Sequence, residues 1–201
     1  FFLQAHAGIR DPLWSRGLGD VYKRQKLRWG NSVQYIIGPD QSPVYSWNLI
    51  AENTKADYYM LAGDEIEFKT VGWDDMIYDC KKKFTDGIFV VAAYDDRGQH
   101  TYDRCTQPFV TKEWATALGY HWNPAFFHWN IDEYTGELCK AVDRFIFIKE
   151  LVIKCSKIKD NTGSRLRKPG LFNRDKWVLD KLMQNNFDSD IGKLREAMAK
   201  A

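Results

Sequence analysis

The feature that most constrains this chain is a short apolar run that ends abruptly in a glycine and two adjacent carboxylates. The run is Tyr58–Leu61, and it is followed by Ala62 and then by Gly63, Asp64 and Glu65. Its length and bulk predict a buried strand, and open α/β sheets bind ligands at the carboxyl ends of their strands. Two carboxylates there indicate a divalent cation, since hard cations take oxygen ligands. A solvated acidic turn is the alternative.

The first twenty-five residues resemble translated sequencing-adapter DNA more than a protein segment. Ser15–Gln25 matches one reading frame of such an adapter without a break, and Gln4 and Gly8–Asp11 fit the same frame, whereas His6 departs from it. The segment has neither the apolar core nor the small-residue cleavage site of a signal peptide. We therefore expect residues 1–25 to be a non-native artefact. A genuine amphipathic leader is the alternative.

Charge and composition narrow the class of protein. The formal net charge is +2, but residues 1–25 hold four basic and two acidic side chains, so the rest of the chain is neutral. That argues against nucleic-acid binding, which normally needs a basic domain or stripe. The aromatic content of 15% fits a dense core or a sugar-binding cleft, in one domain. No run approaches the roughly twenty apolar residues of a membrane span.

The cysteines predict neither disulfides nor a zinc site. Cys80, Cys105, Cys139 and Cys155 lie far apart, without a Cys-x-x-Cys pair or a histidine at zinc-ligand spacing. We expect reduced thiols and a cytoplasmic protein, because a chain of this size folds without disulfides. A cysteine nucleophile would lack an identifiable partner.

Helix and strand patterns alternate from Lys26 onward. Apolar runs predict strands at 33–37, 58–61 and 88–93, and one or two more at 145–148 and 151–155. Ser42 is a predicted N-cap, with Pro43 at the first position of the helix that follows. Helical spacing predicts further helices over 73–84 and about 132–142, a short one that ends at Leu118, and a C-terminal helical part beyond Asn173 with a break near Asn185. A long polar loop covers 94–106. This βαβαβ order predicts an α/β fold with a mostly parallel sheet flanked by helices.

Several short motifs occur in an order that resembles a known family. They are Gly38-Pro39, Trp47-Asn48, Tyr59–Glu65, Gly72–Asp74, Pro108–Val110, Leu118–Tyr120 and His128–Asp132. Together they resemble GT-A fold glycosyltransferases of the inverting "family two" type found in phage and environmental sequences. The resemblance covers 33 to about 155. It implies a partial GT-A catalytic domain at 26–156, lacking its first β-α-β elements, with a basic loop and helices at 157–201 packed on the same domain.

The resemblance also implies a reaction and two key sites. Such enzymes transfer a sugar from a nucleotide-diphosphate donor to a carbohydrate or other hydroxyl acceptor, with Mn²⁺ or Mg²⁺ on an Asp-x-Asp motif. Asp64 and Glu65 match its second and third positions, while Gly63 replaces the first aspartate. Asp132 matches the general base, and its alternative role is a helix N-cap. The histidine that often follows the last strand is absent from Lys154–Ser156.

Further residues are substrate-binding candidates, each with a structural alternative. Asn48 belongs to one of the family-like motifs, and Trp73 and Trp129, like Trp122, could stack on sugar rings or pack in the core. His128 could face the acceptor or be structural. Arg165 and Arg167 could clamp diphosphate, or belong to a solvated basic loop.

Missing first elements would remove the nucleotide pocket. The natural full-length protein would then be the enzyme, and the activity of this fragment is left open. Two other classes stay open. One is a noncatalytic carbohydrate-binding or structural protein that uses the aromatic block 120–129. The other is a metal-dependent hydrolase or nuclease built on Asp64 and Glu65, which would require further carboxylates converging on the same point.

Overall fold

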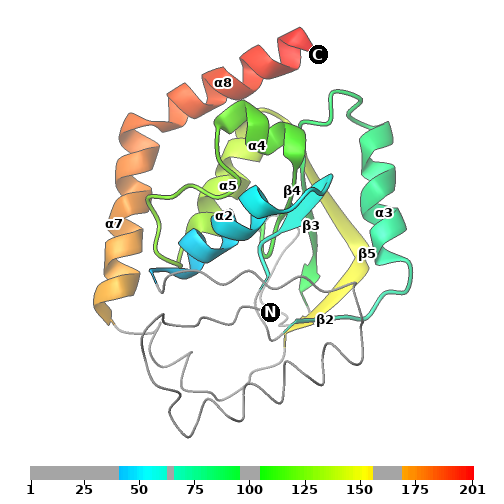
Figure 1. Ribbon diagram of the computed structural model, residues 1–201, viewed down its shortest axis with the longest axis horizontal. Coiled ribbons are helices and arrows are strands. Elements are labelled where there is room, and N and C mark those ends of the chain that lie inside the picture. Colours follow the sequence, from blue (N-terminus) through cyan, green and yellow to red (C-terminus); the bar gives the residue numbers. More distant parts are fainter. Residues whose placement is uncertain (1–40, 63–65, 96–104, 156–168) are drawn as a thin grey trace, which may run out of the picture. The chain divides into compact units, whose positions relative to one another are not determined.

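The computed structural model describes residues 41–62, 66–95, 105–155 and 169–201. The chain divides into two units, Phe1–Gln41 and Ser42–Ala201, and the described elements belong to the second. This unit is an α/β structure with a mixed five-stranded sheet (Figure 1). Its elements, in chain order, are α2 Pro43–Asn53, β1 Tyr58–Met60, β2 Ile66–Phe68, α3 Trp73–Asp79, the 3₁₀ turn η2 Cys80–Lys82, β3 Val90–Asp95, β4 Phe109–Thr111, α4 Lys112–Leu118, α5 Ile131–Ala141, β5 Phe145–Cys155, α7 Pro169–Asn185 and α8 Phe187–Lys200.

Local sequence signals set the ends of the helices. The Ser42 Oγ accepts a hydrogen bond from Tyr45 N at 3.0 Å, and Pro43 occupies the first turn of α2, as predicted. Helix α4 ends at Gly119, whose φ of 84° is a left-handed conformation that glycine adopts without strain. Helix α5 matches the predicted helix within one residue.

The sheet has the strand order β1-β4-β3-β5-β2. Only β3 and β5 pair in parallel, and the other three neighbouring pairs are antiparallel. The predicted mostly parallel sheet is therefore wrong for the described residues. Strand β4 lies between β1 and β3 and is antiparallel to both. Strand β2, which the sequence patterns did not predict, pairs with β5. Strand β1, predicted to be a buried strand, lies at one end of this order and is only partly buried.

Three strands nevertheless run in the same direction. Strands β1 and β3 are both antiparallel to β4, and β5 is parallel to β3. Strands β1, β3 and β5 thus all run toward the same edge of the sheet, hereafter the carboxyl edge. Met60, the last residue of β1, is level with Val91 near the start of β3, because both pair with Phe109, so β1 ends before β3 and β5 do. Strand β2 begins at this edge, because Ile66 pairs with Cys155.

Helix α5 brings its amino end toward the carboxyl edge. Phe145, at the start of β5, pairs with Val90, at the start of β3. Because α5 ends just before β5 begins, the carboxyl end of α5 lies near the edge of the sheet opposite to the carboxyl edge. Helix α5 packs against β5, and a helix of 11 residues extends roughly 16 Å. Asp132, in its first turn, lies on the carboxyl-edge side.

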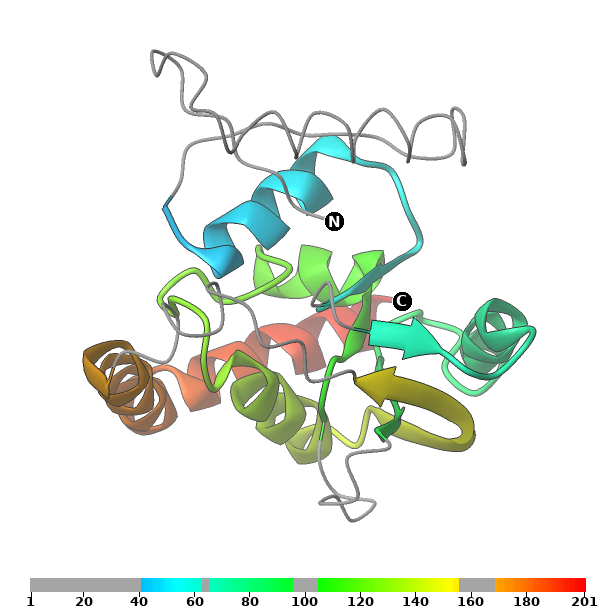
Figure 2. The same ribbon diagram turned by 90° about the horizontal axis from the view of Figure 1, so that it is seen from below.

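Two apolar clusters cover the two faces of the sheet. Strand β3 alternates between them, with Val90 and Ala92 in one and Val91 and Ala93 in the other. This period of two is that of a strand buried on both faces. Helix α3 covers one face, and α4, α5 and α8 cover the other (Figure 2).

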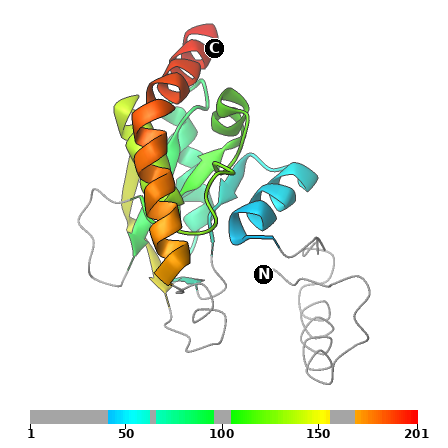
Figure 3. The same ribbon diagram turned by 90° about the vertical axis from the view of Figure 1, so that its left-hand side faces the viewer.

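The C-terminal helices pack on the α5 face. Helix α8 contacts α4 and α5, and α7 contacts α5 and α8 (Figure 3). The side chain of Asp190 accepts hydrogen bonds from the hydroxyls of Tyr120 at 2.6 Å and Tyr134 at 2.9 Å. Burial is the main reason why the pKa of each tyrosine is raised, with the Asp190 carboxylate adding to it. Helix α8 is thereby anchored to α5.

Several predicted boundaries differ from the structure. Helix α7 begins at Pro169 rather than beyond Asn173, because proline fits the first helical turn, and the predicted break falls at Asn186. The helix predicted over 73–84 is shorter in the structure: α3 ends at Asp79, and the 3₁₀ turn Cys80–Lys82 follows it. Strand β5 is continuous through an irregularity opposite Ala93 and Tyr94. The strand predicted at 33–37 lies outside the described residues.

Among the described helices, none combines the length and apolar character that crossing a membrane requires.

Candidate functional site

The structure describes some of the predicted site residues. Asp132, His128, Trp129, Asn48 and Trp73 lie within the described ranges. The predicted metal ligands Asp64 and Glu65 and the predicted diphosphate-binding residues Arg165 and Arg167 lie outside them, and their roles stay predictions. Within the described ranges, histidine, cysteine and acidic side chains form no group of three that could hold a metal ion.

Asp132 is the second residue of α5 and is partly buried. Its Oδ1 accepts a hydrogen bond from Glu133 N at 3.0 Å. The N-cap is Asn130, with a left-handed φ of 62°, so the alternative role of Asp132 as the cap is wrong. His128 lies before this cap and is therefore not part of the helix. The positive end of the α5 dipole favours the ionised form of the Asp132 carboxyl group.

The turn before α5 is held by an aspartate that sequence analysis missed. Asp175, on α7, is fully buried and accepts hydrogen bonds from three successive backbone amides of this turn. Its Oδ1 accepts from Phe127 N at 2.9 Å. Its Oδ2 accepts from His128 N at 2.7 Å and from Trp129 N at 2.8 Å. The only sequence signal is that Asp175 shares a helix face with the apolar Val178 and Leu179.

Helix α2 holds the same segment from another side. Val44 N donates to the Phe127 carbonyl at 3.3 Å, and the ring of Trp47 stacks on His128 with centroids 5.7 Å apart. Asn48 donates its amide to the Trp122 carbonyl at 2.7 Å and accepts from Trp122 N at 2.9 Å. These bonds give Asn48 a structural role, and its contact with substrate stays a prediction.

His128 has an unusual environment. Its Nδ1 is buried and makes no hydrogen bond within the described part of the chain. Burial lowers the pKa of His128, and the nearby Asp175 carboxylate opposes this shift only partly. The imidazole is therefore more readily kept neutral in the folded protein than in the unfolded chain. A neutral imidazole has one nitrogen that can accept a hydrogen bond.

This environment predicts a pH-dependent stability. A lowered His128 pKa means that the unfolded chain binds more protons below about pH 6.5, so stability is intact above that pH and falls as the pH drops toward the lowered value. His128→Gln is expected to reduce this loss between about pH 7 and pH 5, measured as the melting temperature.

His121 provides the comparison, because burial lowers its pKa as well and it packs edge-on against Tyr59 at 4.3 Å. The variant His121→Gln should also reduce the loss of stability at acid pH, by an amount that adds to the effect of His128→Gln. A pH profile unchanged in both variants would contradict the assignment.

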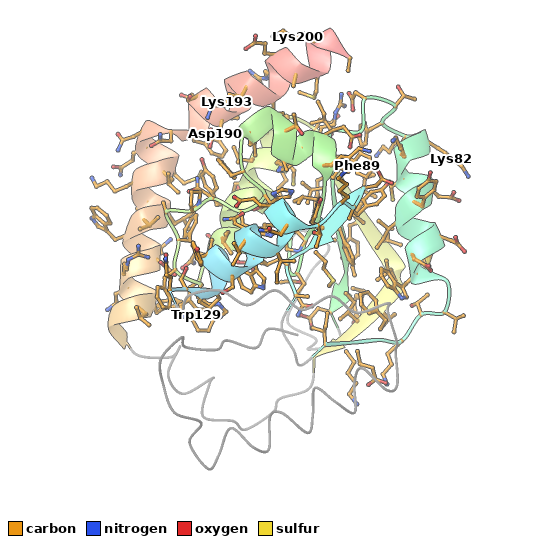
Figure 4. All side chains as sticks on the ribbon, viewed as in Figure 1. Lys82, Phe89, Trp129, Asp190, Lys193 and Lys200 are labelled. Carbon is orange, nitrogen blue, oxygen red and sulfur yellow. The ribbon has the colours of Figure 1, made fainter. Side chains whose placement is uncertain are left out.

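Two of the tryptophans considered for sugar stacking are packed in the protein. Trp73 stacks on Phe68 with centroids 4.0 Å apart, on the α3 face of the sheet. Trp122 is only 1% exposed and belongs to the core on the α5 face. Trp129 is partly exposed and meets Phe172 of α7 edge-on (Figure 4). Only Trp129 therefore keeps an accessible ring next to the turn before Asp132.

Asp95 is a second residue that sequence analysis missed. It was assigned to a polar loop, but it is the last residue of β3 and only 6% exposed. It is level with Ile153 of β5. A buried carboxylate thus ends the strand at the middle of the sheet, on the carboxyl edge.

The described cysteines are free thiols, as expected. Cys80 is partly buried, and Cys105 and Cys139 are buried. A hydrogen bond with Cys139, together with burial, raises the pKa of Cys105 well above its usual range. Such a thiol is a poor nucleophile.

Comparisons with protein-family models, with curated proteins and with solved structures each found no match to this chain.

Proposed function

We propose that this chain is part of an inverting glycosyltransferase with a partial GT-A fold, which transfers a sugar from a nucleotide-diphosphate donor to an acceptor hydroxyl. One observation carries the proposal: strands β1, β3 and β5 run toward a common edge, and the first turn of α5 brings Asp132 toward the same edge. Ligands of α/β sheets bind at such edges. In the sequence, Asp64 and Glu65 follow β1 and directly precede Ile66, which pairs with Cys155 at this edge.

The residue types fit the chemistry. Asp64 and Glu65 offer the oxygen ligands that Mn²⁺ or Mg²⁺ would take, and the cation would neutralise charge on the departing diphosphate. Asp132 would accept the proton of the acceptor hydroxyl as its oxygen attacks the anomeric carbon from the opposite face. Attack from that face inverts the anomeric configuration.

The remaining candidates are assigned by their chemistry. His128 and Trp129, in the turn before Asp132, would contact the acceptor through a hydrogen bond and an apolar ring face. Arg165 and Arg167 would bind diphosphate oxygens, because the guanidinium group forms paired hydrogen bonds with them. Free thiols suit a reducing, cytoplasmic location.

A noncatalytic carbohydrate-binding protein is the weaker alternative. It would use exposed aromatic rings as a sugar platform. Trp122 and Phe126, the centre of the aromatic block, are 1% and 2% exposed, so they are buried in the core and are not accessible to a ligand.

The test is Mn²⁺ binding by the full chain with inorganic diphosphate, a probe that needs no nucleotide-base pocket. We expect diphosphate to strengthen Mn²⁺ binding, measured by titration calorimetry. The double variant Asp64→Asn, Glu65→Gln should bind Mn²⁺ roughly 10-fold or more weakly. Even residues that only hydrogen-bond to a metal ligand typically change metal affinity by about 10- to 100-fold when they are replaced.

The matched control is Glu67→Gln, because Glu67 is a nearby exposed carboxylate that pairs with Lys69 at 2.6 Å. This variant should bind Mn²⁺ like the parent. Equal Mn²⁺ affinity in the parent and in the double variant would exclude the metal site and remove the main support for the transferase.

A further inference from the structure

The turn Phe127–Trp129 presents three successive backbone N–H groups to one buried carboxylate. Asp175 is 0% exposed, and its two oxygens accept these bonds at distances of 2.7 to 2.9 Å. Buried N–H groups without acceptors are costly, so this turn keeps its shape only while an anionic or strongly accepting group occupies that position.

A guanidinium group completes the arrangement. Arg174 Nη1 donates to Asp175 Oδ1 at 2.7 Å, and Nη2 donates to the Ala125 carbonyl at 3.1 Å. Arg174 therefore offsets the buried charge of Asp175 and binds the same loop two residues before the turn. Charged groups with such partners make stronger hydrogen bonds than neutral ones.

The position of the turn determines where α5 begins. Trp129 is followed directly by Asn130, the left-handed cap, whose carbonyl accepts the first α5 hydrogen bond from Tyr134 N at 3.0 Å. Asp132 lies in this first helical turn. A shift of Phe127–Trp129 would consequently move His128, Trp129 and Asp132 together.

We infer that Asp175 is a positioning residue for the proposed transfer reaction: its carboxylate fixes the turn Phe127–Trp129 and thereby holds the acceptor-side groups His128, Trp129 and Asp132 in register with the carboxyl edge. The inference rests on the proposed function. Asp175 acts through the turn and does not itself contact substrate.

Asparagine cannot replace Asp175 in this role. If the amide nitrogen takes the place of Oδ1, it faces the N–H of Phe127 and the guanidinium of Arg174; if it takes the place of Oδ2, it faces the N–H groups of His128 and Trp129. Either orientation sets donors against donors. At least one hydrogen bond of the turn must break.

Asp190 is a matched control within the same chain. It is also a buried carboxylate on a C-terminal helix, at 4% exposure, and it also has a basic partner, Lys193 at 2.7 Å. It anchors its helix through the hydroxyls of Tyr120 and Tyr134. In the described part of the chain, the amides of the turn donate to Asp175 and not to Asp190. Figure 4 labels Asp190 near the junction of α7 and α8, and Trp129 near the other end of α7.

The experiment compares Asp175→Asn and Asp190→Asn in the full chain, at a temperature where both are folded by circular dichroism. Release of nucleoside diphosphate is measured with a panel of UDP- and GDP-linked sugars and simple sugar acceptors. We expect Asp175→Asn to lower kcat by roughly 10- to 100-fold, the scale of an ångström-sized misplacement, with Mn²⁺ and diphosphate binding unchanged. Asp190→Asn should keep kcat within about twofold.

A second measurement reports on the turn itself. Amide hydrogen exchange at Phe127–Trp129 should accelerate in Asp175→Asn and not in Asp190→Asn. An active parent whose two variants show the same kcat and the same exchange at the turn would overturn the positioning role alone. A parent that neither transfers sugar nor binds Mn²⁺ with diphosphate would instead overturn the proposed function, and the positioning role with it. If the parent binds Mn²⁺ with diphosphate but transfers no sugar, equal exchange at the turn in the two variants would overturn the positioning role.

Discussion

Replacing Gly136 with alanine is expected to lower the melting temperature by several degrees. Gly136 lies in the buried face of α5, and a Cβ added there would be 2.7 Å from the Cβ of Cys105, which is itself only 5% exposed. Overpacking of this kind costs about 1–3 kcal/mol and forces the helix or residue 105 to move. The gain from replacing a helical glycine is at most about 1 kcal/mol, so the overpacking dominates.

Gly192 is the matched control. It also lies inside a helix, α8, but a Cβ added there would meet no atom within 4 Å. Gly192→Ala should therefore raise the melting temperature, because only the propensity gain acts. Thermal unfolding followed by circular dichroism compares the two variants. An increase for Gly136→Ala as large as that for Gly192→Ala would show that α5 does not approach Cys105 this closely.

The contact between Gly136 and Cys105 also bears on the candidate site. Cys105 comes between β3, which ends at Asp95, and β4, which begins at Phe109. Gly136 lies one helical turn beyond Asp132. The absence of a side chain at Gly136 thus lets the chain after the carboxyl edge pass directly against the first turns of α5, close to the proposed base.

The helices could be predicted because their signals are local. Ser42 and Pro43 mark the start of α2, and Gly119 marks the end of α4, through hydrogen bonds and backbone angles that involve only a few neighbouring residues. The 3.6-residue spacing of apolar side chains in α5 gave its extent to within one residue. None of these features depends on the tertiary structure.

The sheet topology could not be predicted in the same way. Strands β2 and β4 contain three residues each, too few for a periodic pattern. The apolar run at β1 suggested a central strand, yet its three residues are only partly buried and it pairs with β4 alone among the described strands. The ring of Tyr58 packs against those of Phe89 and Tyr78, at centroid distances of 6.1 and 6.3 Å, so a bulky residue here does not require a central strand.

The missed site residues have a different physical reason. Asp175 binds backbone amides that are 46 to 48 residues away, and those amides need an acceptor only once the turn has formed. Asn48 binds the backbone of a residue 74 positions away. Backbone groups carry no sequence signature, so the partner of a buried polar side chain cannot be identified before the fold is known.

The largest effect on activity is expected at Asp132. The variant Asp132→Asn should lose sugar transfer by roughly 10²- to 10⁴-fold, the usual contribution of a positioned general base. An amide keeps the shape of the side chain and its bond from Glu133 N, at 3.0 Å, but it cannot take a proton from the acceptor hydroxyl. Binding of Mn²⁺ and diphosphate should be nearly unchanged, because Mn²⁺ is assigned to Asp64 and Glu65 and diphosphate to Arg165 and Arg167.

The variant Glu133→Gln is the control for the loss of a negative charge near the amino end of α5. Glu133 is an exposed acid in the same first turn of α5, so removing its charge alters the interaction with the helix dipole in a similar way, by about 0.3–1 kcal/mol of stability. Removing the Glu133 charge should leave the rate of sugar transfer unchanged. Both variants are assayed for released nucleoside diphosphate and titrated with Mn²⁺ and diphosphate. If Asp132→Asn transfers sugar at the parental rate, Asp132 is not the base; if it loses diphosphate binding instead, Asp132 belongs to the donor side of the site.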